Sequence, residues 1–369
     1  MQATQEFPGH RGLMKINLLL CVMLVLLAGC QASVPPKETT IAFAWSYPMG
    51  DYVRSKATVN DGIVYAGADD NAMHAVDANT GEGLWRYETL DNITSTPAVY
   101  EDMIYFGSWD GSINAVGAQE GELRWQYQTD AWVVASPVIT GGILYIGSQD
   151  GYFYALSADK GGLVWQSETG GQIKAGAAVA GNLVFVGSTD NYVYAFDAAN
   201  GELQWRYRTG GDIVSTPAIA DGTVYIGSID RSFYALDAAT GQVGWIFEAD
   251  FAIESSPLIR DGVVYVGAND GRLYALRAQD GHLLWQYQAE NAIRAAPAAW
   301  KHLIFVGSDD GNLYGLNRET GQLAWRYRLG GAIVAGATVT EEKLFVGATD
   351  RRLNAFNLKV EQETGDGAP

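Results

Sequence analysis

The 369-residue chain contains little cysteine, little histidine and few basic side chains for its length. Its two cysteines, Cys21 and Cys30, both precede the repeats described below, which excludes disulfides within the repeat region. Lys and Arg number 24 against 42 Asp and Glu, giving a formal charge of −18. An acidic chain argues against nucleic-acid binding, which requires a basic surface.

Signatures of catalysis and of metal binding are also absent. There is no nucleophile elbow, phosphate loop or Ser/His/Asp arrangement. His10 lies before the repeats and His74 stands alone, while His282 and His302 fall in turns on the same side of adjacent repeats. Two histidines without further ligands do not define a zinc site, so the sequence predicts no metal.

A 40-residue repeat fills most of the chain. One Trp and one Gly recur at this spacing without a slip, and a period near 40 indicates a repeat architecture. The tryptophans are Trp45, Trp85, Trp125, Trp165, Trp205, Trp245, Trp285 and Trp325. The glycines are Gly67, Gly107, Gly147, Gly187, Gly227, Gly267, Gly307 and Gly347.

Each repeat predicts four short antiparallel strands. In one unit they cover residues 213–219, 223–227, 232–236 and 242–248, separated by turn residues such as Asp221-Gly222. No helical period of 3.6 residues occurs after the first 30 residues. Proline falls in the first strand of several units, which marks that strand as a sheet edge and places it at the central channel. The prolines are Pro97, Pro137, Pro217, Pro257 and Pro297.

Eight such units predict an all-β, eight-bladed β-propeller over residues 41–358. The last unit, residues 333–357, contains three strands and lacks the fourth. Residues 41–47 form a fourth strand around Trp45 with no preceding three. We therefore expect the N-terminal strand to complete the last blade and close the ring without a covalent link.

The segments AVDANTGEGLW (75–85), AFDAANGELQW (195–205) and ALDAATGQVGW (235–245) resemble the tryptophan-docking motif of pyrroloquinoline-quinone-type propellers. The resemblance covers about residues 41–358 and implies that the eight tryptophans stack on glycines of neighbouring motifs. Quinoprotein dehydrogenases of this fold type carry an adjacent-cysteine disulfide, a calcium site and a catalytic Asp. Those features are missing here and the repeat register is never interrupted, so we predict neither enzyme activity nor a cofactor.

The N-terminal segment predicts export. MKINLLLCVMLVLLAGC starts at Met14, which we expect to be the true start, and has the charge and apolar run of a signal peptide within residues 1–29. Leu27 to Cys30 resembles a bacterial lipobox, which implies lipidation of Cys30. The alternatives are cleavage elsewhere or an uncleaved anchor. Residues 30–40 predict a tether, and residues 359–369 a flexible tail. Gln31 favours an outer-membrane anchor, with the propeller facing the periplasm.

Differences between the repeats concentrate at the second-to-third-strand turn and at the entry to the first strand, which share one face. Tyr52, Trp109 and Trp132 come from three consecutive blades, with Phe251 farther round. Such aromatics predict a docking patch for a protein; alternatively, the rings fold onto their own blades. Arg54, Lys174 and Arg294, opposed by Glu254, predict an anion site at the channel mouth; alternatively, these are solvated charges.

Together these features predict a monomeric, lipid-anchored docking scaffold with protein partners. The lipobox, tether, eight blades and missing catalytic groups resemble the BamB family, lipoproteins of the outer-membrane β-barrel assembly machinery. That resemblance implies the assembly machinery as partner, although the blades here are more alike than is usual in that family. The alternative function is a periplasmic binding protein or sensor for an anion or quinone. A quinone-dependent dehydrogenase ranks third.

Overall fold

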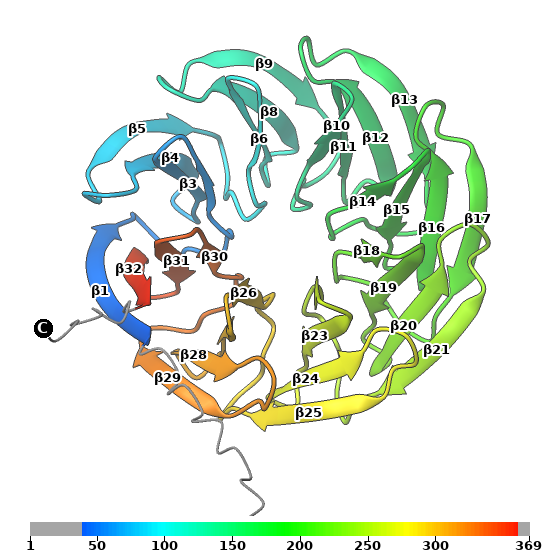
Figure 1. The fold of residues 1–369 in the computed structure, drawn as a ribbon. Coiled ribbons are helices and arrows are strands. Elements are labelled where there is room, and N and C mark those ends of the chain that lie inside the picture. Colours follow the sequence, from blue (N-terminus) through cyan, green and yellow to red (C-terminus); the bar gives the residue numbers. More distant parts are fainter. Residues whose placement is uncertain (1–38, 361–369) are drawn as a thin grey trace, which may run out of the picture.

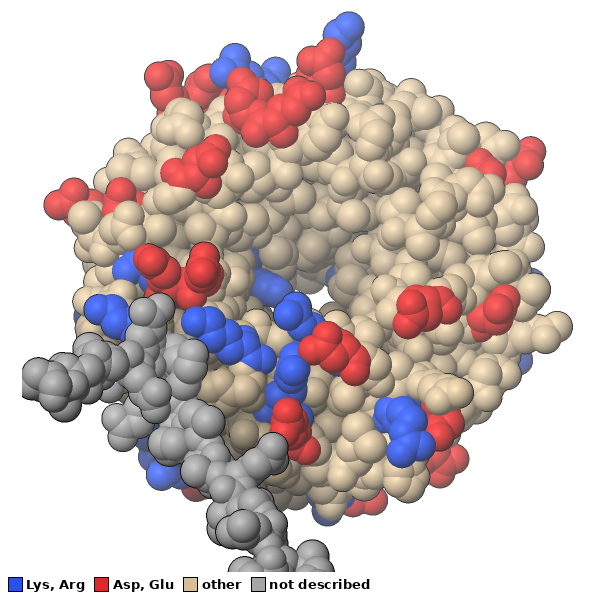
Figure 2. Space-filling view, in the orientation of Figure 1, with Lys and Arg blue, Asp and Glu red and all other residues tan. Residues whose placement is uncertain are grey.

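The computed structural model describes residues 39–360, which form eight four-stranded antiparallel sheets arranged around a central axis (Figure 1). This confirms the predicted all-β, eight-bladed propeller. The space-filling view of one face shows an opening at the centre of the disc (Figure 2). Within residues 39–360 no helix is long and apolar enough to cross a membrane.

The first four blades follow the 40-residue period. Blade 1 contains β2 (Thr58–Asn60), β3 (Ile63–Gly67), β4 (Ala72–Asp77) and β5 (Gly83–Glu88). Blade 2 contains β6 (Ala98–Tyr100), β7 (Met103–Gly107), β8 (Ser112–Gly117) and β9 (Leu123–Gln128). Blade 3 contains β10 (Val138–Thr140), β11 (Ile143–Gly147), β12 (Tyr152–Ser157) and β13 (Leu163–Glu168). Blade 4 contains β14 (Ala178–Ala180), β15 (Leu183–Gly187), β16 (Tyr192–Asp197) and β17 (Leu203–Arg208).

The remaining blades continue the pattern. Blade 5 contains β18 (Ala218–Ala220), β19 (Thr223–Gly227), β20 (Ser232–Asp237) and β21 (Val243–Glu248). Blade 6 contains β22 (Leu258–Arg260), β23 (Val263–Gly267), β24 (Arg272–Arg277) and β25 (Leu283–Gln288). Blade 7 contains β26 (Ala298–Trp300), β27 (Leu303–Gly307), β28 (Asn312–Asn317) and β29 (Leu323–Arg328). Blade 8 contains β30 (Thr338–Val339), β31 (Lys343–Ala348), β32 (Arg352–Val360) and β1 (Thr39–Pro48).

The inner strand of each blade is shorter than the sequence predicts. In blade 5 the ladder covers only Ala218–Ala220, whereas residues 213–219 were expected. Pro217 immediately precedes this ladder and has no N–H to donate, so the chain before it does not pair. The unpaired stretch leads into β18, which lies at the edge of its sheet and faces the channel (Figure 1).

Ring closure by the N-terminal strand is confirmed. β1 pairs antiparallel with β32 from Thr39↔Val360 to Pro48↔Arg352, with a bulge between Phe43 and Trp45. β1 extends beyond the predicted strand 41–47 at both ends, and β32 ends at Val360, beyond residue 357, where the last unit was predicted to end. The first two residues of β1 therefore come from the segment that was predicted to be a tether.

The tryptophans of the outer strands hold neighbouring blades together. Trp205 donates from Nε1 to the carbonyl of Ala238 in the next blade at 2.9 Å. A Cβ on Gly241 would lie 2.6 Å from the Trp205 ring, so a bare backbone is needed for this approach. The same glycine contact occurs below Trp45, Trp85, Trp125, Trp165, Trp245 and Trp285. Trp325 differs because the next blade is blade 8, where it packs against Phe356 in β32 instead of a glycine.

An aspartate in each turn between the second and third strands connects two blades. Asp310 accepts hydrogen bonds from the Asn312 N–H (2.7 Å), the Tyr314 hydroxyl (2.7 Å) and the Glu290 N–H (3.1 Å). The corresponding Tyr–Asp hydrogen bond recurs at Tyr154–Asp150, Tyr194–Asp190, Tyr234–Asp230 and Tyr274–Asp270. The aspartates of these turns therefore accept structural hydrogen bonds, and their negative charge is not simply solvated.

Asp310 makes stability depend on pH. Burial opposes its ionisation, but the hydrogen bonds from Asn312, Tyr314 and Ser308 outweigh burial and hold its pKa below the ordinary value of 3.8. A lowered pKa stabilises the fold above pH 3.8, and this contribution is lost as pH falls through the folded-state pKa. We expect Asp310→Asn to cost about 1–3 kcal/mol at pH 7 and clearly less at pH 3, measured by urea unfolding.

The exposed Asp159 provides the control for this experiment. Its side chain is 80% exposed and forms an ion pair with Lys160 at 3.8 Å, so Asp159→Asn should change stability little at either pH. A cost of Asp310→Asn that is the same at pH 7 and pH 3 would contradict the assignment.

Candidate functional site

The two positions that differ most between the repeats, in the turn between the second and third strands and at the entry to the first strand, lie side by side in each blade. They form pairs around one face of the ring, which we call the variable face. In each blade the N–H of the turn residue donates to the carbonyl at the entry to the inner strand, as from Trp109 to Asn92 and from Gln149 to Trp132. These backbone bonds hold the two variable segments side by side whatever their side chains. The side chains at these positions can therefore differ from blade to blade without disturbing how the blades pack.

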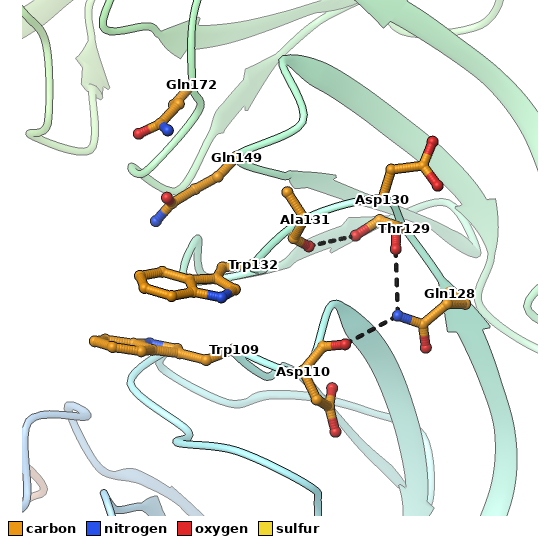
Figure 3. Close-up of a pocket in the computed structure, with 9 residues that line it drawn as sticks. All are labelled: Trp109, Asp110, Gln128, Thr129, Asp130, Ala131, Trp132, Gln149 and Gln172. Atoms are coloured by element: carbon orange, nitrogen blue, oxygen red, sulfur yellow. Dashed lines mark hydrogen bonds between the residues drawn. The ribbon is translucent and has the colours of Figure 1, made fainter.

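Trp109 and Trp132 form the most distinctive feature of this face. Their rings stack at a centroid distance of 4.6 Å and an interplanar angle of 16°, across the boundary between blades 2 and 3 (Figure 3). Trp109 Nε1 donates to Thr94 Oγ1 at 2.9 Å, which fixes the orientation of its indole. Trp132 remains 46% exposed. The structure therefore places two of the four predicted aromatics in direct contact.

A cavity of ≈ 590 Å³ lies beside this tryptophan pair. Figure 3 shows the amides of Gln149 and Gln172 beyond Trp132, on the side away from Trp109. On another side of the cavity, Gln128 Nε2 donates to the carbonyls of Asp110 (3.0 Å) and Thr129 (3.2 Å). The cavity combines an exposed aromatic surface with amide groups, which is the usual make-up of a recognition site.

The other two aromatic candidates lie apart from the pair. Tyr52 is 43% exposed and sits below the guanidinium of Arg351, 6.0 Å from its ring centre. Phe251, in blade 6, is 61% exposed, and within residues 39–360 it stacks on no other aromatic ring. The four aromatics thus do not form one continuous patch.

Two of the three predicted anion-binding cations already have carboxylate partners. Arg54 forms an ion pair with Asp69, and Arg294 pairs with Asp309 at 2.6 Å. Lys174 is exposed, and it makes no ion pair within the described part of the chain. Because the charges of Arg54 and Arg294 are neutralised by these carboxylates, the channel mouth does not offer the three unpaired cations that the sequence predicted.

Glu254 also has a partner, since it accepts a hydrogen bond from Asn269 Nδ2 at 2.6 Å. In all three pairs, a residue at the channel mouth contacts a residue 15 positions later, in the turn between the second and third strands of the same blade. The pairs leave buried oxygens of Asp69, Asn269 and Asp309 without hydrogen-bond partners. Burial raises the pKa of Asp69 even though Arg54 opposes this. Comparing the two variable series blade by blade would have revealed the pairing from sequence.

Arg54 connects this charged sector to the tryptophans. Its guanidinium carbon lies 5.6 Å from the Trp109 ring centre, within cation–π range. Arg54, Trp109 and Trp132 therefore form a continuous arrangement across blades 1, 2 and 3, although Tyr52 was the residue expected to extend the patch into blade 1. Sequence reasoning missed this role of Arg54 because a cation and an aromatic were assigned to separate sites.

The described residues contain no group of three or more His, Cys, Asp or Glu arranged to hold a metal ion. His74 is buried and its Nε2 lies 3.0 Å from Asp70 Oδ2, so it belongs to the turn of blade 1. Cys30, the predicted lipidation site, lies outside the described residues.

The family model for outer membrane protein assembly factor BamB matches residues 42–172, 149–299 and 289–366. BamB from Moraxella catarrhalis superposes with a TM-score of 0.75 at 21% identity, over 86% of this chain and 100% of that one. The computationally designed Ika8 protein gives 0.78 at 18% identity, over 86% and 99%. Quinohemoprotein alcohol dehydrogenase from Comamonas testosteroni gives 0.73 at 17% identity, over 86% and 76%. No curated protein sequence matches this chain.

Proposed function

Because this chain belongs to the outer membrane protein assembly factor BamB family, we propose that it is a docking scaffold of the outer-membrane assembly machinery. In this proposal Cys30 carries a lipid that anchors a monomeric propeller to the outer membrane. The propeller faces the periplasm and presents the Trp109–Trp132 face to a protein partner. The role is non-enzymatic.

The stacked, exposed tryptophan pair carries this proposal. Tryptophan is the residue most often found at the energetic centre of protein interfaces, because it buries a large area with few rotatable bonds. Thr94 and Arg54 hold Trp109 in place, so little side-chain entropy is lost on binding. Trp132 supplies the open surface of the pair.

The charge around the cavity indicates the chemistry of the partner. The exposed side chain of Asp130 lines the cavity together with Asp110, Gln149 and Gln172. The whole chain also carries a formal charge of −18. We infer that the docked segment presents an apolar side chain to the indoles, with basic residues beside it.

The fold alone does not favour a dehydrogenase role. At 17% identity, the alcohol dehydrogenase shares only the architecture with this chain. The 40-residue register is unbroken, so no insertion is available to build a pocket of the kind those enzymes use. These sequence features support a scaffold over a quinone-dependent enzyme.

Replacement of both tryptophans tests the proposal. We expect Trp109→Ala with Trp132→Ala to weaken binding to the purified assembly machinery about 30-fold or more, because truncating an interface hot spot typically costs about 2 kcal/mol or more and the stacked rings act as one hot spot. Affinity is measured by biolayer interferometry on the detergent-solubilised machinery. The melting temperature should change little, because the pair lies on the surface.

Leu203→Ala is the matched control. Leu203 is 49% exposed on the outer strand β17, away from the variable face, and its removal should leave affinity unchanged. Wild-type affinity in the double tryptophan variant, or no binding by the wild-type chain, would refute the proposed docking role.

A further inference from the structure

The channel wall contains a ring of equivalent residues just inside the variable face, which we call the inner ring. It occurs once per blade at the 40-residue spacing, and neighbouring positions such as Ser55 and Ala57 are buried while Lys56 is partly exposed. This alternation turns the inner-ring side chains toward the channel. The ring consists of Lys56, Thr96, Ser136, Gly176, Thr216, Ser256, Ala296 and Gly336.

Hydroxyl groups join neighbouring blades around part of this ring. The Thr96 N–H donates to Ser136 Oγ at 2.9 Å, and the Gly176 N–H donates to Thr216 Oγ1 at 3.0 Å. The Thr216 N–H donates to Ser256 Oγ at 2.9 Å. In these blades the backbone N–H of one inner-ring residue is therefore satisfied by the side chain of the next.

The arrangement fails wherever the next inner-ring residue has no side-chain acceptor. This happens after Ser136 and Ser256, which are followed by Gly176 and Ala296, and at two successive positions in blades 7 and 8. The residue after Ala296 in the ring is Gly336, and the residue after Gly336 is Lys56; neither has a side-chain oxygen that could accept a hydrogen bond. Within residues 39–360 the N–H groups of Ala296 and Gly336 have no hydrogen-bond partner. Backbone donors without partners are uncommon in folded proteins and call for a ligand or water.

Lys56 brings a positive charge to the same sector. A Cβ on Gly336 would lie 3.3 Å from Lys56 Cδ and 2.9 Å from the Ala296 carbonyl, so the lysine stem runs over Gly336. The ammonium is two bonds beyond that Cδ. Within the described residues it has no ion pair and no hydrogen bond, in contrast to Arg54 and Arg294 at the mouth. Burial lowers the pKa of this ammonium, as expected for a cation without a counter-ion.

We propose that the channel binds a small oxyanion between the Lys56 ammonium and the backbone N–H groups of Ala296 and Gly336. Three donors in one sector, together with the inner-ring hydroxyls, suit the acceptor oxygens of a phosphate, sulfate or carboxylate. The site is distinct from the predicted mouth site at Arg54, Lys174 and Arg294. It does not depend on the docking proposal, because none of its groups belongs to the tryptophan pair.

Calorimetric titration of the whole propeller with inorganic phosphate, at constant ionic strength maintained with chloride, tests the site. We expect Lys56→Gln to weaken phosphate binding roughly 10-fold or more, because a charge-assisted hydrogen bond is lost. Lys56→Arg should retain binding within a few-fold. Lys174→Gln, which removes the exposed cation at the mouth, should bind like the wild type. Parallel titrations with sulfate, acetate and citrate distinguish an inorganic anion from a carboxylate.

A second measurement does not depend on whether the Lys56→Gln chain folds. In the wild-type chain with ¹³C-methylated lysines, phosphate should raise the pKa of Lys56, because an anion stabilises the ammonium. Lack of phosphate binding below about 10 mM in the wild type would overturn the proposal. Unchanged binding by Lys56→Gln, or loss of binding only in Lys174→Gln, would overturn it as well.

Discussion

A chain that begins at residue 49 is expected to lose cooperative folding. Removing β1 exposes the edge of β32 along nine residue pairs, from Thr39↔Val360 to Pro48↔Arg352. It also removes Trp45, which is 8% exposed, donates to the Ala78 carbonyl at 3.1 Å and covers Gly81 of blade 1. Loss of one buried Trp alone costs about 3–5 kcal/mol, which is a large share of the stability of a typical domain.

The matched comparison is a chain that begins at residue 31 and keeps β1. We expect a single cooperative unfolding transition for this chain, and a broad or absent transition for the chain that begins at residue 49. A synthetic peptide of residues 39–48 added to the shorter chain should restore part of the transition, because the pairing is non-covalent. Equal melting temperatures in circular dichroism for the two chains would contradict closure by β1.

Gly241→Ala is expected to destabilise the propeller by roughly 2–5 kcal/mol, combining backbone strain with displacement of a partly buried ring. Gly241 has a φ of +70°, where L-residues with a Cβ are strained. Its new methyl group would also lie 2.6 Å from the Trp205 indole. The indole would have to move, which weakens its hydrogen bond to the Ala238 carbonyl.

Gly222→Ala separates these two causes. Gly222 has nearly the same φ, +72°, but no atom lies within 4 Å of the position its Cβ would take. This variant should cost only about 1–2 kcal/mol of backbone strain. Urea unfolding of both variants measures the difference. If both substitutions have the same cost, contact between glycine and indole does not hold the blades together.

The repeat made most of the architecture predictable. A Trp and a Gly every 40 residues indicated equivalent sheets, and the missing fourth strand of the last unit indicated how the ring closes. The inner strands were predicted too long, because β-branched residues before Pro217 resemble a strand although they take no part in the sheet ladder, which starts at Ala218. Extended backbone and paired backbone have the same residue preferences, so sequence alone does not separate them.

The variable face was predictable in outline but not in its contacts. The sequence placed Trp109 and Trp132 on neighbouring blades, yet their stacking depends on side-chain rotamers and on the hydrogen bond to Thr94. Arg54 and Arg294 were interpreted as available cations because their partners, Asp69 and Asp309, are 15 residues away in the chain. Such pairs become visible in the sequence only when the turn series and the strand-entry series are compared blade by blade.

Photo-crosslinking in the producing cell most directly tests the claim that the variable face carries the function. A photoreactive residue in place of Trp132 should form a crosslink to a component of the outer-membrane assembly machinery, whereas the same residue in place of Leu203 on β17 should not. Crosslinks of equal yield from both positions, or from the Leu203 position alone, would contradict the account.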